Sequence, residues 1–139
     1  MLLRTSLITA VIVLVLGCQP RGETKSVEEI LSISKERFNR AYSASEFEKK
    51  KQVGKVIDIL NSILEKPTRT DFLLLGEHLM MLLPHASPTV KTSLYYQADT
   101  SFNLAEKDSI SRGELFLFAS RVYHSLSSEL ETSKFNYNY

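Results

Sequence analysis

Apolar residues recur along most of this chain with the 3.6-residue period of amphipathic helices. The first such stretch predicts a helix over about residues 27–44, and Ser26 with Glu29 forms a capping box at its start. The second stretch covers about residues 45–66, where Ser45 and Glu48 repeat the capping-box pattern. Its apolar stripe consists of Val53, Val56, Ile57, Leu60, Ile63 and Leu64. The two stretches predict two helices or one bent helix, and Pro67 ends the second.

Three further helices are predicted in the second half of the chain. Residues 72–83, FLLLGEHLMMLL, are apolar on almost all sides, which predicts the central helix of a bundle. Thr68 or Thr70 can cap that helix. Ser87 followed by Pro88 marks the start of the next helix. A third capping box, Ser111 with Glu114, opens the last helix, which is expected to end near Glu131.

No segment before residue 133 alternates with the period of two that is typical of strands. The predicted fold class is therefore all-α, a small antiparallel bundle of four to five helices over residues 26–132. The connections between the predicted helices are short, as such a topology requires.

The N-terminal residues have the pattern of a secretory signal peptide. One basic residue, Arg4, precedes 13 uncharged residues that end at Gly17. This run is shorter than the ~17–25 residues of a transmembrane helix. We interpret residues 1–17 as a cleaved signal peptide, with an uncleaved membrane anchor as the alternative.

The end of that run carries the only cysteine of the chain. Val15-Leu16-Gly17-Cys18 resembles the lipobox of bacterial lipoproteins. The resemblance implies that Cys18 receives a diacylglycerol, that cleavage precedes it, and that fatty acyl chains such as palmitate anchor the protein to a membrane. The alternative is a chance cysteine beside an ordinary cleavage site. Residues 18–25 are then a lipidated cysteine and a polar tether.

The residue after the cysteine indicates in which membrane the protein is anchored. In Gram-negative lipoproteins an Asp at this position tends to retain the protein at the inner membrane, whereas this chain has Gln19. The resemblance therefore implies an anchor in the outer membrane if the organism has one. The expected location is the bacterial cell envelope.

Composition narrows the functional classes. Removal of residues 1–17 leaves 122 residues, and loss of Arg4 lowers Lys plus Arg from 17 to 16, equal to the 16 Asp plus Glu. A net charge near zero gives no reason to expect nucleic acid as a partner. A single cysteine excludes an intramolecular disulfide, so packing alone stabilises the domain.

The chain lacks the motifs of common catalytic and metal sites. Its three histidines, His78, His85 and His124, do not have metalloprotease spacing. None of the serines lies in a nucleophile elbow, and no Gly-rich phosphate loop is present. We therefore expect no enzyme activity, no catalytic residues, no cofactor and no metal site.

Two features remain that contact with a surface or a partner would explain. Lys49, Lys50, Lys51 and Lys55 form the densest basic cluster, which either contacts an anionic surface or is a solvated helix face. In the tail, residues 133–139, the aromatic residues Phe135, Tyr137 and Tyr139 alternate with polar ones. This resembles the terminal strand signal of outer-membrane barrels. The tail is a frayed end, packs on the bundle, or adds as a strand to a partner.

The leading functional hypothesis is a non-catalytic interaction or assembly lipoprotein that binds another envelope protein. The alternative is a carrier that binds a lipid or other apolar ligand between its helices. For the carrier, the apolar interior would come from Leu73, Leu74, Leu79, Met80, Met81 and Leu82. A large empty apolar cavity would favour the carrier, and a filled core with an exposed groove would favour the partner-binding protein.

Overall fold

The computed structural model describes residues 25–136, with side chains up to Glu131. These residues form five α-helices and one short 3-10 helix, and they contain no strand. The elements are α1 (Val27–Ala44), α2 (Phe47–Glu65), α3 (Arg69–Leu82), η1 (Leu83–His85), α4 (Pro88–Ala105) and α5 (Arg112–Asn136). The predicted all-α class and the five helices are confirmed.

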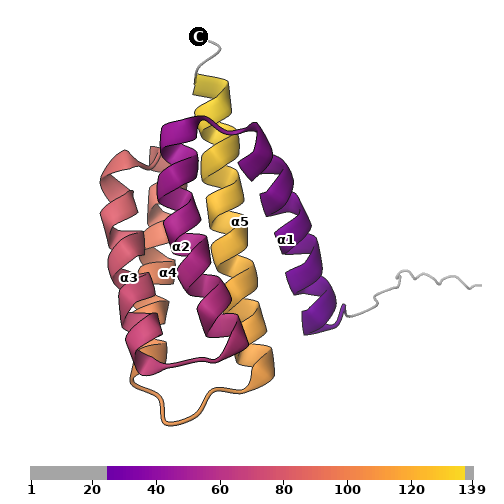
Figure 1. The fold of residues 1–139 in the computed structure, drawn as a ribbon, viewed down its shortest axis with the longest axis vertical. Coiled ribbons are helices and arrows are strands. Elements are labelled where there is room, and N and C mark those ends of the chain that lie inside the picture. The colour runs from indigo at the N-terminus through magenta and orange to yellow at the C-terminus, as the bar shows by residue number, and fades with distance from the viewer. Residues whose placement is uncertain (1–24, 137–139) are drawn as a thin grey trace, which may run out of the picture.

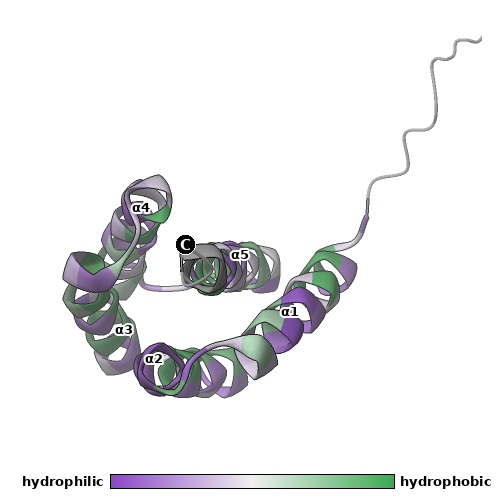
Figure 2. Ribbon diagram, turned by 90° about the horizontal axis from the view of Figure 1, so that it is seen from above, coloured by the Kyte–Doolittle hydropathy of each residue, from purple (hydrophilic) through white to green (hydrophobic). Residues whose placement is uncertain are grey.

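Consecutive helices run in opposite directions (Figure 1). Seen along the bundle, α1, α2, α3 and α4 form an arc around α5, and this arc is open between α1 and α4 (Figure 2). The most extensive packing of α5 is against α1, with further contacts to α2 and α4. The fold is thus an antiparallel bundle with its last helix at the centre.

The prediction that residues 72–83 form the central helix is wrong. α3 lies in the arc, and three of its apolar side chains, Leu74, Met80 and Met81, are 39–65% exposed. The opposite face of α3 supplies Phe72, Leu75 and other buried residues to the core. α3 is therefore a two-sided helix of the periphery, and its apolar outer face is open to solvent.

Most of the predicted helix starts are confirmed by hydrogen bonds. Ser26 accepts from the Glu29 backbone N–H at 3.2 Å, and the Glu29 carboxylate accepts from the Ser26 N–H, which completes the capping box. Thr68 caps α3 by accepting from the Asp71 N–H. Ser111 likewise accepts from the Glu114 N–H at the start of α5.

The capping box predicted at Ser45 is wrong. Ser45 ends α1 instead, where its hydroxyl donates to the Tyr42 carbonyl at 2.9 Å. α2 starts after Glu46, which makes no side-chain cap. Because Ser45 and Glu46 both have extended backbones, the chain breaks into two helices rather than one bent helix.

The apolar stripe predicted for the second helix lies in the core. Val53, Leu60 and Ile63 are completely buried. α3 and α4 approach each other closely at Gly76, where an added Cβ would lie 2.5 Å from the Phe102 ring. Glycine at this position therefore allows the packing of the two helices.

The last helix is longer than the sequence predicts. α5 continues to Asn136, five residues beyond the expected end at Glu131. Phe135 therefore belongs to a helix rather than to an alternating, strand-like tail. Tyr137 and Tyr139 lie outside the described residues.

Tyr123 of α5 is the aromatic centre of the contact between α1, α2 and α5. Its ring packs edge-on against Phe38 at 5.4 Å, and its hydroxyl donates to Asn61 Oδ1 at 2.9 Å. Burial disfavours the charged phenolate and raises the pKa of Tyr123 from 10.0 to about 12. Its neutral form therefore stabilises the folded state.

This pKa predicts alkaline destabilisation. Because the folded pKa of Tyr123 lies above the unfolded one, its contribution is complete below about pH 10 and is lost as the pH rises through about 12. Over this window the wild type should lose roughly 2–3 kcal/mol more unfolding free energy than Tyr123→Phe. Urea titrations at both ends of the window measure this difference, and Tyr95→Phe, at an exposed position, is the control. Equal losses in wild type and Tyr123→Phe would contradict the prediction.

Candidate functional site

The open sector of the arc exposes one stripe of α5. Leu117, Arg121 and His124 follow each other at helical spacing along this stripe, and Arg121 and His124 are exposed to solvent. The neighbouring Ser120 and Ser125 are buried at its edges. This stripe forms the floor of a groove.

The walls of the groove come from the two helices that end the arc. α1 contributes Ile30 and Ser34, and α4 contributes Ser93 and Gln97. Together with the floor they enclose a hollow of about 340 Å³ that opens to solvent. We call this surface the α5 groove. Its lining has serines on the walls and on the floor, and small side chains allow an occupant to approach the helix backbones closely.

Two hydroxyls of the α5 groove can act only as hydrogen-bond acceptors toward an occupant. The Ser34 hydroxyl donates to the Ile30 carbonyl at 2.9 Å, and the Ser120 hydroxyl donates to the Phe116 carbonyl at 2.8 Å. Each hydroxyl has therefore used its only hydrogen, and its remaining lone pairs can only accept. Gln97 is 7% exposed, and its Oε1 has no hydrogen-bond partner among the described residues.

A buried carboxylate links three helices at the other end of the bundle from the start of α1. The Glu129 side chain is 2% exposed and accepts from Lys49 Nζ at 2.6 Å. It also accepts from the backbone N–H of Ser87 at 2.9 Å and from the Ser87 hydroxyl at 3.1 Å. Lys49 Nζ donates in addition to the His85 carbonyl at 2.7 Å. Glu129 thus caps the N-terminus of α4, where a negative charge is favourable.

Because of this cluster, part of the predicted basic surface is not available to solvent. Lys49 is largely enclosed in the ion pair, and Lys50 lies over the Tyr42 ring at 5.0 Å. Lys51 and Lys55 are exposed on α2. The four lysines therefore do not form one continuous exposed cluster. Contact of the remaining ones with an anionic surface stays a prediction.

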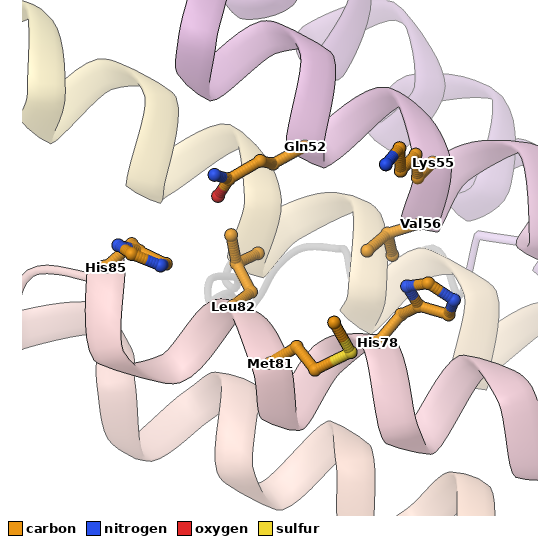
Figure 3. A pocket seen from close by; sticks show the side chains of 7 residues that line it. All are labelled: Gln52, Lys55, Val56, His78, Met81, Leu82 and His85. Atoms are coloured by element: carbon orange, nitrogen blue, oxygen red, sulfur yellow. The ribbon is translucent and has the colours of Figure 1, made fainter.

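A second hollow lies between α2 and α3. Lys55 and Gln52 border it on α2, and His78 and His85 lie at its two ends with Leu82 and Met81 between them (Figure 3). Its volume is about 210 Å³. The two histidines come from different elements, His78 from α3 and His85 from η1, and lie at opposite ends of the hollow rather than side by side (Figure 3).

The described part of the chain contains no cluster of side chains placed to bind a metal ion. His124 lies in the α5 groove, away from the hollow that His78 and His85 share. No group of three or more His, Cys, Asp or Glu residues is placed there to hold an ion.

Two predicted sites involve side chains that lie outside the described residues. Cys18 precedes the described residues, so the lipidation site stays a prediction. The same holds for partner binding by Phe135, Tyr137 and Tyr139, because the described side chains end at Glu131.

The important polar residues of the last two helices were missed from the sequence. Burial of Glu129 could have been predicted from the sequence. It is seven residues after Val122 and fourteen after Leu115, on the core-facing side of α5. A charged residue in that register predicts a buried partner. No sequence pattern distinguishes Gln97 and Arg121, because a single polar residue on a helix is normally solvated.

Comparison with protein-family models, curated proteins and solved structures found no match for this chain. No helix among the described residues has the length and apolar character to cross a bilayer.

Proposed function

We propose that this protein is a lipid-anchored bacterial envelope lipoprotein that binds another envelope protein through the α5 groove. The observation that carries the proposal is the groove itself, whose lining includes the exposed Arg121, which makes no ion pair with any described residue. An acidic group on an occupant would pair with this guanidinium.

The anchor and the groove are compatible in geometry. α1 begins at Val27, nine residues after Cys18, and nine extended residues reach at most about 30 Å. Lipid on Cys18 would therefore hold the end of the bundle where α1 starts close to a membrane. The α5 groove runs along the side of the bundle and stays open to a partner.

The same geometry bears on the basic residues. α2 is antiparallel to α1, so Lys50 and Lys51 at its start lie at the end of the bundle opposite Val27 (Figure 1). An anionic surface that these lysines contact would face away from the anchoring membrane. The proposal includes an anchor in the outer membrane, because Gln19 rather than Asp follows Cys18.

Partner binding is better supported than ligand carriage. Of the residues considered for an apolar cavity, Leu79 and Leu82 are packed in the core, while Met80 and Met81 point outward. The hollow bordered by Met81 and Leu82 measures only about 210 Å³ and has Lys55 and two histidines at its rim. Small-molecule sites are usually ~300–1,000 Å³ and mostly apolar.

In-cell photo-crosslinking tests the proposed function. A photoreactive amino acid at Ser93, exposed on the wall of the groove, should crosslink the lipoprotein to an envelope protein. The matched control is Ser32, which is exposed on α1 and lines a different hollow. Arg121→Glu, a change in the groove floor, should weaken the Ser93 adduct by about tenfold or more.

Two results would reject partner binding through the groove. One is the same set of adducts from Ser93 and Ser32. The other is a Ser93 adduct that is unchanged by Arg121→Glu in a variant with wild-type melting temperature.

A further inference from the structure

The proposed function leaves open what kind of structure enters the α5 groove. α5 is flanked by helices except in the sector between α1 and α4, and its exposed stripe has the spacing of a helix contact face (Figure 2). A groove between two helices, with a third as its floor, is a shape that accepts another helix. We therefore consider a helix as the occupant of the α5 groove.

The hydroxyls of the groove set the first requirement on that helix. Ser34 on one wall and Ser120 on the floor donate their hydroxyl hydrogens to carbonyls of their own helices. Their remaining lone pairs accept N–H donors, and the side-chain amide of Asn or Gln supplies these without a charge.

The charge of the lining adds a second requirement. Among the described residues, the lining contains no Asp or Glu, and Arg121 is its one fully basic residue; it is exposed and makes no ion pair with any of them. Arg37, nearby on α1, differs in that Glu131 already pairs with it at 3.6 Å. An acidic side chain on the occupant would complement Arg121, and guanidinium–carboxylate pairs are among the stronger polar contacts.

These requirements identify one occupant. We propose that the α5 groove is the docking site for an α-helix of the envelope partner, which presents an Asn or Gln to the Ser34 hydroxyl and an Asp or Glu to Arg121. The inference rests on the proposed function and specifies its partner.

A displayed library of helix-stabilised peptides about four turns long, roughly 14 residues, tests the inference. The bait is the full lipid-modified chain in detergent. Peptides enriched on it should carry a carboxylate and an Asn or Gln on one face. Binding of these peptides should fall about tenfold or more on Arg121→Glu, the size of effect expected for one lost charge pair.

Charge reversal supplies the decisive control. An enriched peptide in which the acidic residue is replaced by Arg should regain affinity for Arg121→Glu and lose affinity for the wild type. Ser93→Trp, which fills the groove from an exposed position, should also abolish binding. Arg40→Glu and Ser32→Trp, both on the outer face of α1, should leave binding unchanged.

Failure of this inference differs from failure of the proposed function. No enriched peptide, enrichment without carboxylates, or no rescue by charge reversal would overturn the helix-docking inference, even if Ser93 crosslinks an envelope protein in cells. Absence of any groove-dependent crosslink would instead overturn the proposed function. If Ser93→Trp fails to fold, the exposed Arg121→Glu exchange alone decides the inference.

Discussion

Replacing Glu129 with alanine is expected to lower the free energy of unfolding by about 3–5 kcal/mol, the range for removing one partner of a buried ion pair. The change leaves the Lys49 ammonium and the Ser87 backbone N–H without their carboxylate. It also uncaps α4. Because small domains have a total stability of only ~5–15 kcal/mol, urea unfolding should show a large decrease in the midpoint concentration.

Glu131 is a matched control for this experiment. It lies two residues further along α5, but its side chain is 46% exposed and pairs with Arg37 at 3.6 Å. Glu131→Ala should cost less than about 1 kcal/mol, as is typical of surface pairs. If Glu129→Ala costs no more than Glu131→Ala, the buried cluster does not hold the three helices together.

Replacing Cys18 with serine is expected to abolish incorporation of labelled palmitate. The proposed diacylglycerol is attached through the cysteine sulfur, which serine lacks. Each buried CH₂ contributes about 0.8 kcal/mol, and one acyl chain alone anchors weakly, so loss of all chains removes stable membrane attachment. The variant should therefore leave the membrane fraction in high salt while the wild type stays.

The neighbouring exchange Gln19→Ser is the control for the lipid label. It alters the residue after the proposed cleavage site but keeps Cys18, so labelling should equal that of the wild type. Equal labelling of wild type and Cys18→Ser would refute lipidation, as would release of the wild-type protein by salt alone.

The amino-acid sequence by itself determined the class of the fold and most helix starts. These features depend on residues close in the chain: Ser26 and Glu29 cap one another across a single turn, and Thr68 caps the turn that follows it. The stripe through Leu60 was recognised as core because burial of one helix face produces a fixed period. Interactions between residues that are close in the chain can therefore be predicted from a local sequence pattern.

Which helix occupies the centre was decided only by the tertiary structure. α3 is the more apolar helix, yet α5 is central and buries Ser120 and Ser127. Both serines donate to a carbonyl one turn earlier in their own helix, which makes their burial inexpensive although a sequence pattern counts them as polar.

The polar sites were likewise decided by tertiary packing. Lys49 and Glu129 form an ion pair although they are 80 residues apart in sequence. Gln97 and Arg121 line the same groove only because α4 and α5 lie side by side. The periodic pattern records that a helix has a buried face but not which helix covers it. Packing of five helices around one another selects those neighbours, and with them which charge is paired in the interior and which charge is left exposed in a groove.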